Sequence, residues 1–376
     1  MRRTVPAVFA RGGTSKGLIF LASDLPDGRA VRDAMFLRAM GSPDPAGRQL
    51  NGMGGGLSSL SKVCIVAPSD RQDADVDYTF VQVQVRDAMV DYSGNCGNMA
   101  SAIGPFAVET GLIDAPDGVL TVRIHNTNTS KIIRSTFEVR DGQAVEDGDL
   151  VIPGVSGSGA PIRLDFLSPG GATTGRVLPG GSASSILETS FGPVEVSLVD
   201  AGNACAFVPA ASVGAHGTES PEYIDGSAEL CARLREIREL ASVAMGITPD
   251  VDAARRKMLV PLVAMVSPAA DFTDLSGQRV HAENVDVTIR MISNGQAHRA
   301  IPMTGAVCVA VAAEIEDTVV HRARRAPGGD LRIGMPSGVL TVAAEVRRDG
   351  SNGWHAASGA IYRTTRQLFR GEVSVR

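Results

Sequence analysis

The stretch GNCGNMASAIGPFAVETGL, residues 94–112, decides the fold. It predicts a helix with small or apolar side chains nearly all the way round, despite the proline at position 105. A helix of this kind has no face for water and must be covered on every side. The stretch therefore predicts a buried helix with a curled sheet around it.

A second stretch of the same kind occurs later in the chain. Residues 305–318 read GAVCVAVAAEIEDT, which is again apolar around the whole circumference of a helix. Similar strand sequences follow the two helices, LTVRIH at 120–125 and LRIG at 331–334. Earlier in each half, two strands flank a glycine turn, at residues 5–21 and 194–208. This repetition indicates an internal duplication.

The chain has 376 residues, which is too long for one ordinary compact core. We expect two domains, residues 1–186 and 187–376, each with a sheet around one helix. Whether the last strand pairs in the second domain or returns to the first domain stays open. Residues 153–181 are rich in Gly, Ser, Thr and Pro and are expected to form crossover loops.

The composition is that of a soluble globular protein. Hydrophobic residues make up 44% and charged residues 20%, and the net charge is −5. Such a chain has no general field that would attract nucleic acid or an anionic membrane surface. The apolar run at residues 5–9 is too short for a signal sequence, and no stretch approaches the roughly 18 apolar residues of a membrane helix. We expect a cytoplasmic protein that binds neither nucleic acid nor membrane.

The motif SGNCGN, residues 93–98, places Cys96 at the mouth of the first predicted helix. Free N–H groups and the positive helix end favour a thiolate there and can hold a developing oxyanion. The five cysteines are scattered, with no C-x-x-C pair, which argues against a disulfide framework or a zinc site. The alternative, a small core residue in a glycine-rich helix start, stays open.

Two further motifs carry cations. The run GMGGGLSSLSK, residues 52–62, delivers Lys62 immediately before an apolar strand, where a buried lysine can act as a base. The motif RGGTSKG, residues 11–17, predicts a hairpin whose hydroxyls, amides and cations can bind carboxylates. A solvated lysine and a plain turn are the alternatives. Neither a Walker motif nor a G-x-G-x-x-G motif is present, which argues against nucleotide binding.

The second half carries matching positions. DAGN at 200–203 corresponds to the hairpin, and MTGA at 303–306 to the helix mouth, where Thr304 stands in the place of a second cysteine. Cys308 lies one turn deeper and is expected to be a core thiol. His298 is either a carboxylate ligand or a structural histidine.

With these motifs, the sequence resembles the 2-methylaconitate cis–trans isomerase family, or PrpF family, over nearly its full length. That family includes 3-methylitaconate delta-isomerases and 4-oxalomesaconate isomerases. The matching segments are RGGTSKG at 11–17, GSPD at 41–44, SK at 61–62, DY-x-GNCGN at 91–98, NTNT at 126–129 and DAGN at 200–203.

The resemblance implies an α+β, diaminopimelate epimerase-like fold. Two pseudo-symmetric domains, each a β-barrel-like sheet around a central helix, would hold the active site between them. The related epimerases and racemases use two opposed cysteines, whereas this family keeps one and adds a lysine, which implies Cys96 and Lys62 here. The expected substrate-binding residues are Arg11, Gly13, Thr14, Ser15, Lys16, Ser61, Ser93, Asn95, Gly97, Asn98, Asn203, His298, Thr304 and Gly305.

The implied activity is a cofactor-independent, metal-free shift of a carbon–carbon double bond in a small unsaturated di- or tricarboxylate. The candidate substrates are 4-oxalomesaconate, 2-methylaconitate, aconitate and methylitaconate. Lys62 and Cys96 act as base and acid, and the reverse assignment stays open. The alternatives are an amino-acid racemase or epimerase, a cysteine hydrolase, and a non-catalytic polycarboxylate-binding protein. A homodimer also stays open.

Overall fold

The computed structural model describes residues 4–293, 295–350 and 353–375. The chain divides into two compact units. Unit 1 comprises Met1–Phe166 together with Tyr362–Arg376, and unit 2 is Leu167–Ile361. The sequence places the boundary at residue 186, but the segment after residue 167 is bonded to unit 2. The amides of Thr173 and Thr174, for example, donate to the carboxylate of Asp200 at 2.8 and 2.6 Å.

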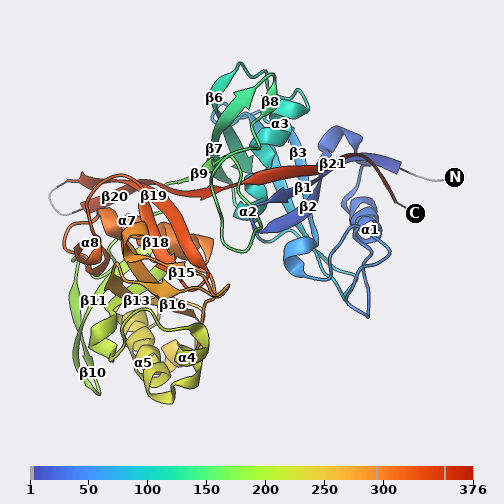
Figure 1. Cartoon of the computed structure of the whole chain (residues 1–376). Coiled ribbons are helices and arrows are strands. Elements are labelled where there is room, and N and C mark those ends of the chain that lie inside the picture. The colour runs from blue at the N-terminus through green and yellow to red at the C-terminus, as the bar shows by residue number, and fades with distance from the viewer. Residues whose placement is uncertain (1–3, 294, 351–352, 376) are drawn as a thin grey trace. The chain divides into compact units, whose positions relative to one another are not determined.

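Unit 1 is built on a sheet whose strands alternate between hairpin and crossover connections. β1 and β2 form a hairpin, β2 runs parallel to β3, β3 antiparallel to β4, β4 parallel to β6, and β6 antiparallel to β7. The C-terminal strand β21 lies antiparallel beside β1 (Figure 1). The strands are β1 (Thr4–Gly12), β2 (Ser15–Leu21), β3 (Lys62–Pro68), β4 (Val76–Val83), β5 (Val90–Asp91), β6 (Gly118–Asn126), β7 (Lys131–Arg140), β8 (Gln143–Ala144), β9 (Ile162–Leu167) and β21 (Thr365–Ser374).

Unit 2 repeats this order. β11 and β12 form a hairpin, β12 runs parallel to β13, β13 antiparallel to β16, β16 parallel to β18, and β18 antiparallel to β19. The same sequence of strand directions in both units confirms the internal duplication. The strands are β10 (Ser185–Thr189), β11 (Gly192–Ala201), β12 (Asn203–Pro209), β13 (Leu262–Pro268), β14 (Phe272–Thr273), β15 (Arg279–Val280), β16 (Val287–Ser293), β17 (Gln296–Ala297), β18 (Leu331–Met335), β19 (Gly338–Asp349) and β20 (Gly353–Arg363), whose last two residues belong to unit 1.

Each unit encloses one helical segment, as the apolar circumference predicts. In unit 1, α2 (Gly97–Ala100) contacts β1 and β2, while α3 (Ile103–Glu109) contacts β6 and β7. In unit 2, α7 (Met303–Glu314) contacts β11, β12 and β19. The single helix predicted over residues 94–112 is divided in two. Pro105 has no N–H to donate, and restarting the helix at Ile103 places Pro105 in a first turn, where none is needed.

A second helix covers the outer face of each sheet. In unit 1, Phe36 and Met40 of α1 (Arg29–Met40) pack with Leu18, Phe20 and Val63. In unit 2, α5 (Ala228–Ala244) packs on β12 and β13 in the same way. Because strand side chains alternate between faces, Ser15, Gly17, Lys62 and Cys64 are left on the inner face of unit 1, toward α2.

The remaining helices are short. Within the described ranges, no helix is both long enough and apolar enough to cross a membrane. The short helices are the α-helices α4 (Pro221–Gly226), α6 (Val251–Arg256) and α8 (Val319–Ala323) and the 3₁₀ helices η1 (Ala22–Asp24), η2 (Ser58–Leu60), η3 (Ala210–Val213) and η4 (Ala282–Asn284).

The close packing around Gly104 of the enclosed helix predicts how a substitution there changes the free energy of unfolding. A Cβ at Gly104 would lie 2.6 Å from Cε1 of Phe137 and 2.9 Å from Oγ of Ser135. We expect Gly104→Ala to lower the free energy of unfolding by about 1–3 kcal/mol, because overpacking outweighs the better helix propensity of alanine. Urea denaturation measures the change. Gly226→Ala is the control, since a Cβ there meets no atom within 4 Å, and equal losses in both variants would contradict the packing argument.

Candidate active site

Lys62 opens β3 and lies on the inner face of unit 1. Its backbone pairs with Gly17 of β2 on one side and with Gln82 of β4 on the other. A Cβ at Gly17 would lie 2.6 Å from the carbonyl oxygen of Lys62, so this close approach requires glycine. The lysine side chain is buried, with 8% exposed. Its Nζ donates to Oε1 of Gln82 at 2.7 Å and lies 4.9 Å from the ring centre of Phe80.

The amide of Gln82 has only one orientation that satisfies its partners. Its Nε2 lies near the carbonyl oxygens of Ser58, Ser61 and Val83, at 3.1, 3.0 and 3.3 Å. These groups only accept, so nitrogen must face them and oxygen must face Lys62. Gln82 therefore fixes the position of the amine without adding a counter-charge.

Cys96 immediately precedes the first residue of α2 and is partly exposed. Its Sγ lies 4.0 Å from Oγ of Ser15, and its carbonyl oxygen accepts the hydroxyl of Tyr78 at 3.4 Å. Cys64 lies 3.9 Å from the same hydroxyl and is fully buried, which raises the pKa of the Cys64 thiol well above its usual range. Of these two thiols, only Cys96 is placed to reach a ligand.

The segment leading to Cys96 is held by the NTNT motif. The side chain of Asn128 bonds the N–H and the carbonyl of Phe80, at 2.7 and 2.9 Å, and the carbonyl of Tyr92 at 2.7 Å. This places residue 92 beside β4, four residues before the thiol. The motif therefore positions the site through backbone bonds.

The glycine hairpin of residues 11–17 packs directly on the start of α2. A Cβ at Gly12 would lie 2.5 Å from the carbonyl oxygen of Asn98, and one at Gly13, where φ is +52°, would lie 2.3 Å from Oδ1 of Asn98. Asn98 also donates to Oγ1 of Thr14 at 3.2 Å. Ser15 is buried, with 2% exposed, and faces Cys96.

The two cations of this hairpin point elsewhere. Nη1 of Arg11 donates to the carbonyl and Oγ1 of Thr364, at 2.9 and 3.0 Å, and to the carbonyl of Gly13. Lys16 alternates to the opposite face of β2 from Ser15, and its Nζ lies 5.8 Å from the ring centre of Phe9. Arg11 therefore fastens the hairpin to the C-terminal segment.

The other candidates in unit 1 have varied surroundings. Ser61 is fully buried, and its Oγ accepts from Nε2 of Gln49 at 2.7 Å. Ser93 is exposed, and its amide donates to Asp91. Gly97 is buried as the first residue of α2. The Oδ1 atom of Asn95 is buried and has no hydrogen-bond partner among the described residues.

Four candidates belong to unit 2. A Cβ at Gly202, beside Asn203, would lie 3.2 Å from the carbonyl oxygen of Thr304, so this hairpin also packs on a helix start. Gly305 is buried against Met291. His298 is half-buried, and its Nε2 bonds Oγ of Ser293 at 2.6 Å. Burial lowers the pKa of His298.

In the described part of unit 2, the start of α7 carries no thiol that corresponds to Cys96. The residue before α7 is Pro302, and Thr304 is an exposed residue of its first turn. Cys308 is fully buried and bonds the carbonyl of Val199 at 3.4 Å, as expected for a core thiol. The hydroxyl of Thr304 is a much weaker acid than a thiol, and Cys308 is fully buried, so neither residue is placed to act as a second acid.

The sequence motifs do not identify several residues that surround Lys62 and Cys96. Gln82 orients Lys62, Gln49 anchors Ser61, and Arg363 approaches Asn98, with its Nε donating to Oδ1 at 3.0 Å. Burial lowers the pKa of Arg363 to about 10, while Cys96 opposes this shift. No motif marks any of these residues.

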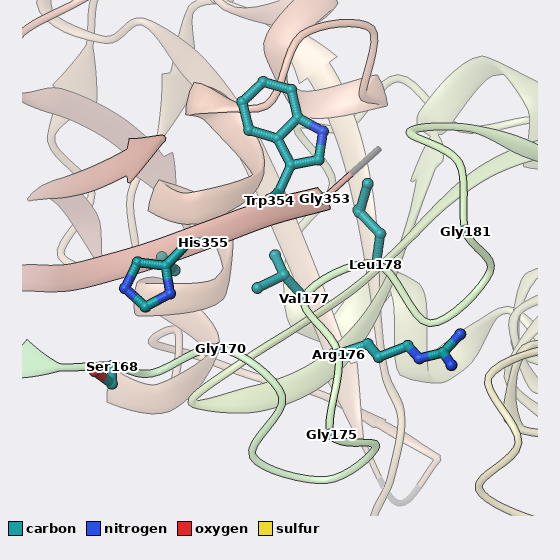
Figure 2. Close-up of a pocket in the computed structure, with 11 residues that line it drawn as sticks. Ser168, Gly170, Gly175, Arg176, Val177, Leu178, Gly181, Gly353, Trp354 and His355 are labelled. Carbon is teal, nitrogen blue, oxygen red and sulfur yellow. The ribbon is translucent and has the colours of Figure 1, made fainter. Parts of the chain in front are cut away.

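A separate cavity of about 430 Å³ lies in unit 2 (Figure 2). Val177 and Leu178 point from a loop toward the part of β20 that carries Trp354 and His355 (Figure 2). None of the candidate residues named above lines this cavity. No group of three or more His, Cys, Asp or Glu residues suited to a metal ion occurs in the described part of the chain.

Comparison with known proteins places this geometry in a family. A family model described as PrpF protein matches residues 2–376. The chain is 40% identical to a 3-methylitaconate isomerase of Eubacterium barkeri over 99% of this chain and 97% of that relative. It is 38% identical to a 2-methyl-aconitate isomerase of Cupriavidus necator over 99% and 97% of the two chains. The crystal structure of a methylitaconate-delta-isomerase matches with a TM-score of 0.90 and 40% identity, over 100% of this chain and 96% of that one.

Proposed function

Because the chain belongs to the PrpF family of isomerases, we propose that it moves a carbon–carbon double bond within a small unsaturated di- or tricarboxylate. Lys62 and Cys96 transfer the protons. The named relatives act on methylitaconate, methylaconitate and, in a Novosphingobium relative 36% identical, (4E)-oxalomesaconate. These acids share a carboxyl group next to a double bond and define the substrate class proposed here.

One observation carries the proposal. Lys62 is buried beside the neutral amide of Gln82. Cys96 lies at the N-terminus of α2, on the same inner face of the unit 1 sheet. A buried amine and a thiol on one face of one sheet supply the two groups that a double proton transfer requires. A lysine kept only for solubility would instead lie in water.

The reaction requires two proton transfers. Neutral Lys62 removes a proton from the carbon between a carboxylate and the double bond, which leaves a dienolate and a lysine ammonium. The thiol of Cys96 donates its proton to the distal carbon, so the double bond moves by one position and a thiolate remains. A proton then passes from the ammonium to the thiolate, directly or through water, which restores both groups.

The start of α2 is suited to hold the developing charge. The N–H of Ala100 donates to the carbonyl of Cys96 at 2.9 Å, so the amides of Gly97 and Asn98 precede the first helical bond. Fixed amide donors of this kind stabilise an oxyanion without reorganising. The polar surroundings of Cys96 thus favour an enolate-type intermediate.

The test is proton NMR in D₂O with methylitaconate, 2-methylaconitate, aconitate and 4-oxalomesaconate, each incubated with the protein. We expect one acid to show a shifted double bond with deuterium at the carbon that gains a proton. Binding of the acids without exchange or shift would favour a non-catalytic polycarboxylate-binding protein. Deuterium at the α-carbon of an amino acid such as proline would favour a racemase or epimerase.

A further inference from the structure

The buried arginines of unit 1 and unit 2 differ in what neutralises them. Those described as buried are Arg238, Arg290, Arg324 and Arg363. Arg238 lies 3.5 Å from the carboxylate of Glu239, and Arg324 is paired with Glu314. Arg290 lies near three carbonyl oxygens and 5.0 Å from the ring centre of Phe272.

Arg363 has fewer partners. Its Nε donates to the amide oxygen of Asn98 at 3.0 Å, and its Nη1 donates to the carbonyl of Tyr362 at 2.9 Å. Among the described residues, no carboxylate pairs with it and its Nη2 donates no hydrogen bond. Burying a cation without an anion is strongly unfavourable, so a bound anion would stabilise this arrangement.

The surroundings of Arg363 indicate where an anion would lie. Its Cδ is 3.0 Å from the Cβ position of Gly13, and Cys96 is the group that opposes the lowering of its pKa by burial. Asn98 occupies the Nε side of the guanidinium. Nη2 and the second N–H of Nη1 are left to form the paired hydrogen bonds that a carboxylate accepts.

We infer that Arg363 binds a carboxylate of the substrate beside the thiol of Cys96. This inference rests on the proposed function, because it assigns the residue that recognises the acid in that reaction. Held in this way, the carboxylate would fix the position of the neighbouring carbon relative to Cys96. Arg363 would then select substrates that carry a carboxylate, whereas Lys62 and Cys96 would transfer the protons.

The test measures binding separately from turnover. Isothermal titration with 2-methylsuccinate and tricarballylate, saturated acids that have no double bond to move, gives Kd for the wild type, Arg363→Met and Arg363→Lys. We expect Arg363→Met to weaken binding roughly 10- to 100-fold, as for the loss of hydrogen bonds to a charged group, with Arg363→Lys in between. For the substrate, we expect the loss in kcat/KM to come mainly from a higher KM.

Arg290→Met is the matched control, because Arg290 is also buried but lies among backbone carbonyls. We expect this control to lower Tm, because three carbonyl oxygens lose their donor, and to leave Kd unchanged. Arg363→Met leaves two acceptors without this donor and removes a buried cation that has no anionic partner among the described residues, so we expect its Tm to stay the same or to rise.

Two results with the variants and one with the wild type would overturn the inference. One is an unchanged Kd in Arg363→Met, and the other is a fall in Tm of Arg363→Met together with an unchanged Kd in Arg363→Lys. No binding of either acid or of any candidate substrate by the wild type would overturn it as well. If the wild type binds these acids through Arg363 but turns none of the candidates over, the inference stands and the proposed isomerase activity fails.

Discussion

Lys62→Met is expected to lower kcat for the double-bond shift by about 10²–10⁴-fold, the usual contribution of a general acid or base. Methionine fills the space of the lysine stem beside the Phe80 ring but has no amine to take a proton. The exchange of substrate protons for deuterium should fall by the same factor, because no dienolate forms. Initial rates and NMR exchange in D₂O measure the two quantities.

The fold should tolerate this change. The buried lysine is replaced by an apolar side chain of similar length, and the main loss is the donor to Gln82, worth about 1–3 kcal/mol. Lys131→Met is the control, since Lys131 is an exposed residue at the start of β7. Activity within twofold of the wild type in Lys62→Met would remove Lys62 from the mechanism.

Cys96→Ser is expected to lower product formation by about 10²–10⁴-fold while leaving proton exchange in the substrate, because serine is a much weaker acid than a thiol. With Lys62 intact, the dienolate still forms, takes deuterium back at its original carbon and returns to substrate. The measurement is the ratio of deuterated substrate to product over time. This ratio distinguishes the acid from the base.

The opposite pattern would exchange the two roles. If Cys96→Ser abolishes exchange and Lys62→Met retains it, the thiolate removes the proton and the ammonium returns it. Cys231→Ser is a suitable control, because Cys231 is another partly exposed thiol, and it bonds the carbonyl of Ile224 at 3.1 Å. A loss of activity in this control would indicate a general effect of replacing cysteine.

Local signals in the sequence predict much of this fold. The apolar circumference of residues 94–112 and 305–318 predicts enclosed helices, and the repeated order of strands and turns predicts the duplication. These patterns depend on neighbouring residues, which the sequence displays directly. The break at Pro105 is local as well, but the apolar pattern continues through it and hides it.

Other features depend on pairing between distant segments. β9 lies within the Gly- and Ser-rich stretch expected to be loop. The first segment of unit 1 ends at residue 166, because the residues that follow it bond to unit 2. Gln82 meets Lys62 only through the register of β3 and β4. Arg363 and Asn98 are 265 residues apart along the chain. No spacing within a motif reports contacts of this kind.

The pairing of β1 with β21 has a consequence for biosynthesis. Unit 2 is continuous, whereas unit 1 needs residues from both ends of the chain, including Arg363 and the strand that follows it. During translation, one edge of β1 therefore stays unpaired until residues 365–374 have left the ribosome. Closing a loop of this length is slow and leaves a sheet edge exposed to other chains. The surroundings of Cys96 are thus completed only once residue 363 has been made and can meet Asn98.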